Sequence, residues 1–219
     1  MLIDSIENKQ KILSEFLKIC PFSGWNDFAL EEAIIAAGIE VKFIKLIFKN
    51  GAADLADFFI KENDRQMIEQ LTALNLDSMR VRDKIKSALQ IRLSLFAPNK
   101  TAIKRLINFY SAPKNLRRAF KNIYKTADLI WYQIGDKSTD YNFYSKRIIL
   151  SKIYISSLKF FLDDSSEDNQ KTWLFLDKEI AKIMKFEVFK TKIKTGLQDL
   201  SNKSVKDLLK KLPFLRLFI

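Results

Sequence analysis

The chain has 219 residues, of which 38 are Lys or Arg, 26 are Asp or Glu, one is cysteine and none is histidine. These counts exclude Ser-His-Asp and Cys-His catalysis, Glu-x-x-His metal motifs and Cys-rich zinc sites. With no glycine-rich phosphate loop either, the sequence predicts neither an enzyme nor a metal site, while its net charge of +12 allows nucleic acid or anionic lipid as a partner.

The first half of the chain is predicted to form successive helices. An apolar face recurs with helical spacing and ends at Pro21, so the first helix is expected to stop there. Asp27 is predicted to cap the second helix at its start and Gly38 to cap it at its end. The expected ranges are residues 12–19, 28–37, 41–48 and 52–74.

The second half continues the helical pattern, with breaks at Pro98 and Pro113 and at the polar stretch after Gly135. The expected helices cover residues 77–97, 101–110, 116–134, 144–162, 166–184 and 188–212. The sequence therefore predicts an all-α protein, a TetR-like helical bundle with a helix-turn-helix-like head and a C-terminal amphipathic helix. Its expected parts are a head at 1–50, a lipid-binding and dimerisation bundle at 51–187 and a tail at 188–219, within one structural domain overall.

The order of the first four helices is typical of a TetR-like DNA-binding head. The third segment, VKFIKLIF, offers only Lys42 and Lys45 as polar side chains, whereas base reading requires Arg, Asn, Gln, Ser or Thr. Its apolar side chains are expected to be buried or to face lipid. A DNA-binding regulator therefore stays an alternative, and no specific nucleic acid partner is predicted.

The C-terminal segment alternates apolar side chains at helical spacing with many lysines, which is typical of a basic amphipathic helix at a membrane surface. The alternative is a final helix that docks on the bundle. No apolar stretch approaches the roughly 20 residues that span a bilayer, so a soluble or peripheral protein is expected. The predicted location is the bacterial cytoplasm, peripheral on the inner membrane, with a membrane surface containing anionic lipid as a partner. The expected membrane contacts are Leu197, Leu200, Leu208, Leu209, Leu212, Phe214, Leu215 and Phe218.

A polar, aromatic-rich connector between two apolar runs carries the most specific signal. The pattern GDxSTDxNxYxKR at residues 135–147, followed by LDDSSEDxxxTWxFLD at 162–177, resembles the Coq-nine family of ubiquinone-biosynthesis accessory proteins. The resemblance implies a TetR-like homodimer that has given up DNA binding. It also implies an isoprenoid or quinone lipid as bound ligand, no covalent cofactor, and presentation of that lipid to the demethoxyubiquinone hydroxylase.

The resemblance also implies a partner-binding patch, with Phe143 where the family usually has Trp. Phe143 and Tyr144 are expected at its apolar centre, with Asp140 and Arg147 at its rim. Core packing is favoured over partner contact for Trp131 and Tyr132. The patch maps onto Asp128, Ile130, Gln133, Asp140, Phe143, Tyr144 and Arg147.

The lipid site is expected on the inward faces of three helices, because each of them has an apolar side. The candidate residues are Leu89, Leu93, Ile123, Leu129, Ile149, Ile153 and Leu158. The acidic run Asp163, Asp164, Glu167 and Asp168 is predicted to start a helix rather than to bind a metal, because no spaced oxygen-ligand loop accompanies it. A plain helical scaffold stays open as a third hypothesis.

Overall fold

The computed structural model describes residues 3–139 and 141–182. Within these residues the secondary structure is helical, with no strand, which confirms the all-α prediction. Residues 1–176 form one compact unit and residues 177–219 a second one. The predicted parts at 1–50, 51–187 and 188–219 have no counterpart in this division and stay predictions.

The head comprises α1 (Ile6–Ser23), α2 (Asp27–Ala36), a short 3-10 helix (Val41–Phe43) and α3 (Ile44–Ile47). The expectation that the first helix stops at Pro21 is wrong, because α1 continues to Ser23. A proline in the last turn removes only one backbone hydrogen bond. The helix ends at Gly24, whose positive φ of 79° favours glycine and whose N–H donates to the carbonyl of Cys20 at 2.8 Å.

Both ends of α2 are closed by side chains and backbone of the head. Asn26, not Asp27 as predicted, caps the start, and its side chain accepts from the N–H of Ala29 at 2.9 Å. Gly38 ends the helix as predicted: it has a φ of 72°, and its N–H donates to the carbonyl of Ile35 while that of Ile39 donates to Ile34.

Asp27, the first residue of α2, instead connects this helix to the start of α4 (Ala52–Thr72). Its carboxylate accepts from the N–H of Ala52 at 2.8 Å. Gly51 lies beside that carboxylate with a φ of 59°, and a Cβ atom at Gly51 would come within 2.1 Å of Asp27 Oδ1. The close approach therefore requires glycine at this turn.

The predicted third helix is not continuous. A 3-10 turn and the four-residue α3 replace it, and Phe48 leaves the helix with a φ of −133°. Its apolar side chains are also divided, because Ile47 and Phe48 are buried whereas Leu46 is 59% exposed. Burial, the first of the two expectations, therefore holds for Ile47 and Phe48 but not for Leu46, and contact with lipid stays a prediction.

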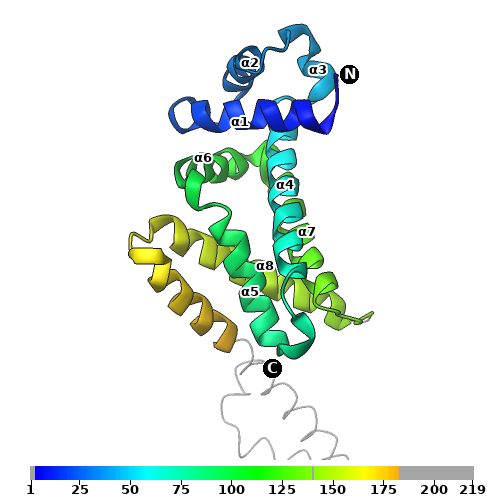
Figure 1. Cartoon of the computed structure of the whole chain (residues 1–219), viewed down its shortest axis with the longest axis vertical. Helices are drawn as coiled ribbons and strands as arrows, with labels where there is room; N and C mark the ends of the chain where they lie inside the picture. The colour runs from blue at the N-terminus through cyan, green and yellow to red at the C-terminus, as the bar shows by residue number, and fades with distance from the viewer. Residues whose placement is uncertain (1–2, 140, 183–219) are drawn as a thin grey trace, which may run out of the picture. The chain divides into compact units, whose positions relative to one another are not determined.

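The bundle comprises α4 (Ala52–Thr72), α5 (Val81–Ser94), α6 (Lys100–Ser111), α7 (Pro113–Gln133) and α8 (Tyr141–Asp163) (Figure 1). Helix α4 packs on α5 and α7, α7 also packs on α6 and α8, and α1 packs on α2, α4 and α6. Single 3-10 turns lie at Leu76–Ser78, Ala97–Asn99 and Glu167–Asn169, and residues 170–182 are helical. Pro113 begins α7 because its missing N–H costs nothing at the first helical position, so this helix starts three residues before its predicted start.

An aromatic chain links the head to the bundle. The rings of Phe16 and Trp25 lie 4.7 Å apart, those of Trp25 and Phe59 5.7 Å, and those of Phe59 and Phe96 5.8 Å. The indole N–H of Trp25 donates to the carbonyl of Ala102 at 2.9 Å. Head and bundle therefore share one core within residues 1–176.

Candidate functional site

The α7–α8 junction is a short polar connection. Gly135, with a φ of 86°, closes α7: its N–H donates to the carbonyl of Tyr132, and the N–H of Asp136 donates to Trp131. Helix α8 then begins at Tyr141, three residues before its predicted start, so Phe143 and Tyr144 lie in its first turn. The connector thus sets the position of both aromatic rings.

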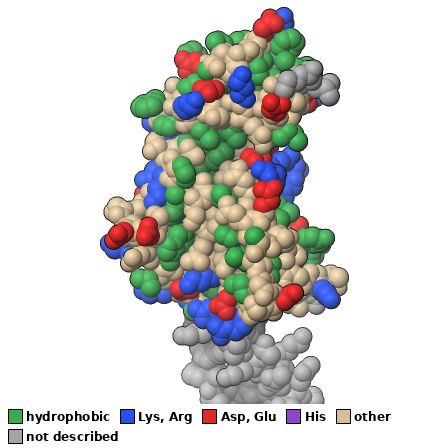
Figure 2. All heavy atoms as spheres, in the orientation of Figure 1, with side chains coloured by type: hydrophobic (Ala, Val, Ile, Leu, Met, Phe, Trp, Pro, Cys, Tyr) green, Lys and Arg blue, Asp and Glu red, His purple; other side chains and the backbone are tan. Residues whose placement is uncertain are grey.

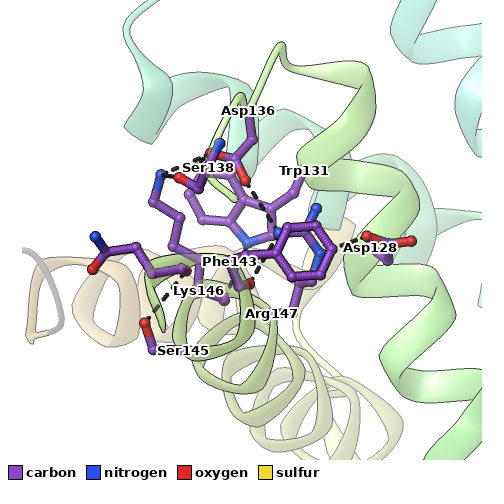
Figure 3. Close-up of polar contacts among 9 residues, drawn as sticks. Asp128, Trp131, Asp136, Ser138, Phe143, Ser145, Lys146 and Arg147 are labelled. Atoms are coloured by element: carbon purple, nitrogen blue, oxygen red, sulfur yellow. Dashed lines mark hydrogen bonds and ion pairs between the residues drawn. The ribbon is translucent and has the colours of Figure 1, made fainter. Parts of the chain in front are cut away.

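A buried cation lies beneath the Phe143 ring. The side chain of Arg147 is 3% exposed, and it donates to the carboxylates of Asp128 and Asp136 and to the carbonyl of Phe143. The Phe143 ring covers the guanidinium, with 3.3 Å between the guanidinium carbon and the ring centroid (Figure 3). Arg147 therefore ties α7, the connector and α8 together, and the prediction that it lies at an exposed rim is wrong.

Asp136 accepts hydrogen bonds from three side chains at the connector. Its Oδ1 accepts from Lys146 Nζ at 2.7 Å and from Ser138 Oγ at 2.9 Å, and its Oδ2 accepts from Arg147 at 3.1 Å (Figure 3). Burial by itself would raise the pKa of Asp136, but the hydrogen bonds from Lys146, Ser138 and Arg147 outweigh burial and lower the pKa to about 2. The carboxylate is therefore charged at neutral pH and holds the connector in place.

Aromatic side chains gather at this junction and differ in exposure. Phe143 is half-buried and meets Tyr144 edge to face, with 5.1 Å between centroids. Tyr144 is 59% exposed and Tyr132 is 78% exposed, so core packing of Tyr132 was a wrong prediction. Trp131 is half-buried, and its indole N–H donates to the carbonyl of Lys146 at 3.1 Å.

The structure separates the predicted partner-binding residues. Phe143, Tyr144, Asp128 and Arg147 lie together at the junction as described above. Ile130 is buried in the core, so it cannot contact a partner without a rearrangement. Gln133 donates to Thr72 Oγ1 at 2.8 Å, and Asp140 lies outside the described residues. The patch itself stays a prediction.

A cavity of about 300 Å³ lies between α4, α6, α7 and α8. Its inner wall is buried and includes Phe96, Thr126 and Tyr154, whereas apolar side chains at its mouth are exposed, with Phe120 at 64%. Hydrophobic side chains also reach the surface elsewhere, among charges of both signs (Figure 2). The cavity lining is Ile60, Phe96, Ile103, Leu106, Ile107, Tyr110, Ser111, Leu116, Ala119, Phe120, Asn122, Ile123, Thr126, Tyr154, Ile155 and Leu158.

Two of the predicted lipid-site residues, Ile123 and Leu158, line this cavity. Three others are packed in the core, namely Leu89, Leu93 and Ile153. Ile149 is half-buried, and Leu129 is exposed and lines a different groove, which residues of α4 and α7 share. The sequence did not predict that α6 contributes to the cavity lining. Its amphipathic pattern shows that one face is apolar, but not whether that face lines a cavity or packs against a neighbouring helix.

The acidic run after α8 is held by local hydrogen bonds. Asp164 accepts from the N–H groups of Ser166 and Thr172, both at 2.8 Å. Burial raises the pKa of Asp164, but these bonds, with those from both hydroxyls, lower it well below its usual value. Asp163 pairs with Lys104. In the described part of the chain, no three acidic or cysteine side chains are grouped so that they could hold a metal ion.

The predicted membrane contacts, Leu197, Leu200, Leu208, Leu209, Leu212, Phe214, Leu215 and Phe218, lie outside the described residues. None of the helices at 3–139 and 141–182 combines the length and the apolar character needed to cross a bilayer.

Comparison with known proteins connects this site to one family. Residues 116–187, which contain the junction, match the model of the COQ9 family. The chain is 33% identical over 193 residues to the probable ubiquinone biosynthesis protein coq9, mitochondrial, of Dictyostelium discoideum, covering 85% of this chain and 63% of that protein. It is 26% identical over 182 residues to the ubiquinone biosynthesis protein COQ9, mitochondrial, of Homo sapiens, covering 80% and 57%. The chain thus spans about three fifths of the length of these relatives.

The fold is similar to that of the TetR transcriptional regulator from Nitrosomonas europaea, with a TM-score of 0.67 at 15% identity. That likeness covers 80% of this chain and 97% of the regulator, which confirms the TetR-like fold. The predicted location in a bacterial cytoplasm is contradicted, because the curated relatives are named mitochondrial proteins and so point to mitochondria. The comparisons confirm the resemblance that the sequence indicated: residues 116–187 match the COQ9 family model, and the chain as a whole has a TetR-like fold.

Proposed function

We propose that this chain is a non-enzymatic accessory protein of ubiquinone biosynthesis, which binds an isoprenoid or quinone lipid and presents it to the demethoxyubiquinone hydroxylase. The cavity between α6, α7 and α8 carries this proposal. The names of the COQ9 relatives support the pathway, since they are called ubiquinone biosynthesis proteins.

The cavity has the physical character of a lipid site. Its wall is mainly aliphatic and aromatic, and burying each methylene of a chain in such a wall contributes about 0.8 kcal/mol. About 300 Å³ is the low end of the usual ligand-site range. The cavity therefore takes a ring or a short piece of chain, and the rest of a long isoprenoid leaves through the exposed mouth.

The aromatic junction is the proposed contact for the hydroxylase. Tyr144 offers an exposed ring, and Phe143 is fixed from below by the Arg147 guanidinium. Rigid aromatic side chains often dominate binding energy because they bury a large area at a small cost in entropy. A ring that is already ordered before binding therefore suits a partner contact.

Membrane contact through residues 188–219 and homodimer formation are part of the same proposal. Lysines near an anionic surface contribute about 1 kcal/mol each, and the apolar side chains of an amphipathic helix add to this on burial. Both ideas rest on the sequence pattern and on the family resemblance.

Specific DNA binding is less well supported. The four-residue α3 presents Lys45 as its only polar side chain, and Lys42 before it pairs with Glu40. A recognition helix needs several residues that reach base edges. The TetR-like fold alone does not imply DNA binding, because a fold does not fix a function.

Native mass spectrometry of the purified protein, followed by lipid extraction, tests the ligand. A quinone or isoprenoid is expected in the extract. Leu158→Trp should reduce its amount because the larger ring fills the cavity, whereas Leu174→Trp at an exposed position should not. An extract that holds only bulk phospholipid, equally in both variants, would overturn the lipid proposal.

Pull-down of the hydroxylase tests the partner site. Phe143→Lys should weaken binding by on the order of 2 kcal/mol or more. Phe22→Lys, at an exposed position on α1, serves as the control. Equal recovery of the hydroxylase by Phe143→Lys and wild type, at matched stability, would show that the partner binds elsewhere.

A further inference from the structure

The mouth of the cavity is an apolar area on the outside of the bundle. It extends into an adjoining groove between α7 and α8, because Phe120, Ile123 and Ile155 line both the cavity and the groove. Among the described residues that line them, none is Asp or Glu. We call this area the mouth surface and define it by its exposed apolar side chains on α6, α7 and α8, which are Ile107, Leu116, Phe120, Ile148 and Ile155.

Four cations border the mouth surface, two on α7 and two on α8. Those on α8 line the groove, and those on α7 are exposed within one turn of Phe120. They are Arg117, Lys121, Lys152 and Lys159. Only Lys159 has a carboxylate near it, that of Asp163, which also pairs with Lys104. In the described part of the chain the other three have no ion-pair partner, so the mouth surface is apolar at its centre and positive at its edges.

This distribution of charge restricts what can cover the mouth surface. Contiguous exposed apolar areas commonly mark contact sites. A second copy of the chain, joined across a twofold axis, would place the same unpaired cations against each other. The lining offers no carboxylate to compensate them, and like charges across an interface are costly. The partner must therefore be apolar at its centre and negative around it.

An anionic lipid surface has both properties. Its headgroups are negative, its acyl chains are apolar, and both can adapt to an irregular protein surface. The Phe120 side chain protrudes from α7, whereas the cavity behind it is hollow, and acyl chains can cover the first and enter the second. Lysine and arginine side chains reach along an apolar surface toward the headgroups.

We propose that the mouth surface docks on an anionic membrane, so that the cavity opens toward the acyl chains. The inference rests on the proposed membrane association of the chain and gives it a second surface, on the folded bundle, separate from residues 188–219. The two surfaces together fix how the bundle is oriented on the bilayer. A lipid can then pass between the bilayer and the cavity without crossing water.

A label on the mouth surface tests this contact in the full chain. Cys20 is completely buried, and burial raises the pKa of its thiol to about 12, so a thiol reagent attacks an introduced cysteine instead. Phe120→Cys and, on α1, Phe22→Cys replace exposed rings and each receive a nitrobenzoxadiazole label. The vesicles contain equal parts of phosphatidylcholine and phosphatidylglycerol, with a spin-labelled phospholipid as quencher. The label at residue 120 should lose more than half of its emission, and the label at residue 22 should lose little.

Charge variants test the edges of the mouth surface. Arg117→Gln combined with Lys121→Gln should weaken binding to anionic vesicles about fivefold for each cation removed. Binding to vesicles of phosphatidylcholine alone should change little. Lys11→Gln combined with Lys49→Gln removes the same charge from exposed positions near the head, and this matched control should leave binding nearly unchanged.

The outcomes separate this inference from membrane association in general. Absence of quenching at residue 120, while the wild type still floats with the vesicles, would overturn the mouth surface as the membrane contact and would point to an acidic protein as its partner. Equal losses of binding in the two charge variants would also overturn it, because net charge alone would then explain the attraction. Failure of the wild type to float with anionic vesicles would overturn the proposed membrane association as a whole.

Discussion

Replacement of Arg147 by methionine tests how the α7–α8 junction is held. The substitution removes a 3% exposed guanidinium that donates to two carboxylates and to the carbonyl of Phe143. Loss of one partner of a buried ion pair costs about 3–5 kcal/mol. Asp136 keeps its bonds from Lys146 and Ser138, and Asp128 is 44% exposed, so the cost should lie near the lower end, at about 3 kcal/mol.

Urea unfolding followed by far-ultraviolet circular dichroism measures this loss. For a chain of this length, about 3 kcal/mol corresponds to a fall of roughly 6–12 °C in Tm. Arg147→Lys should lose about half as much, because one ammonium reaches only one of the two carboxylates.

A double variant separates the buried pair from general damage to α8. In the Arg147→Met background, Asp136→Asn should cost less than it costs in the wild type, by about 1 kcal/mol or more, because its bond from Arg147 is already absent while those from Lys146 and Ser138 are lost in both cases. A loss below about 1 kcal/mol for Arg147→Met, or additive losses in the double variant, would refute the view that this ion cluster fixes the junction.

Three further outcomes are expected. The pKa of Asp136 in the folded protein is about 2, below its ordinary value of 3.8. Its contribution to stability is therefore present above about pH 4 and is lost as the pH falls toward 2. In a plot of the urea unfolding midpoint against pH, Asp136→Asn should reduce the slope on the acid side. Gly51→Ala should destabilise the fold by more than Gly38→Ala, since both have positive φ but only the first Cβ would collide with Asp27; equal losses in urea unfolding would contradict the close approach. Removal of residues 213–219 should weaken vesicle flotation while leaving helicity intact, and undiminished flotation would show that another surface binds the membrane.

The sequence by itself determined the helices and several of their ends. Helical spacing of apolar residues shows that a segment will bury one face, and Gly38 shows where a helix must stop, because these are local properties of the backbone. The motif around Phe143 and Tyr144 also indicated the family without any structure. Local rules were weaker at Pro21, where the loss of one hydrogen bond in a last turn does not outweigh the packing of α1 on its neighbours.

Tertiary structure alone decided which helix faces enclose the cavity and which charges are buried. An amphipathic pattern does not say whether its apolar face meets a packed neighbour or a hollow, so Leu89 and Leu93 were predicted at a lipid site but lie in the core. Arg147 and Arg92 look like surface cations in the sequence. Each is paired with a carboxylate outside its own helix, Asp64 on α4 for Arg92 and Asp128 on α7 for Arg147, and only the packing of these helices brings the partners together.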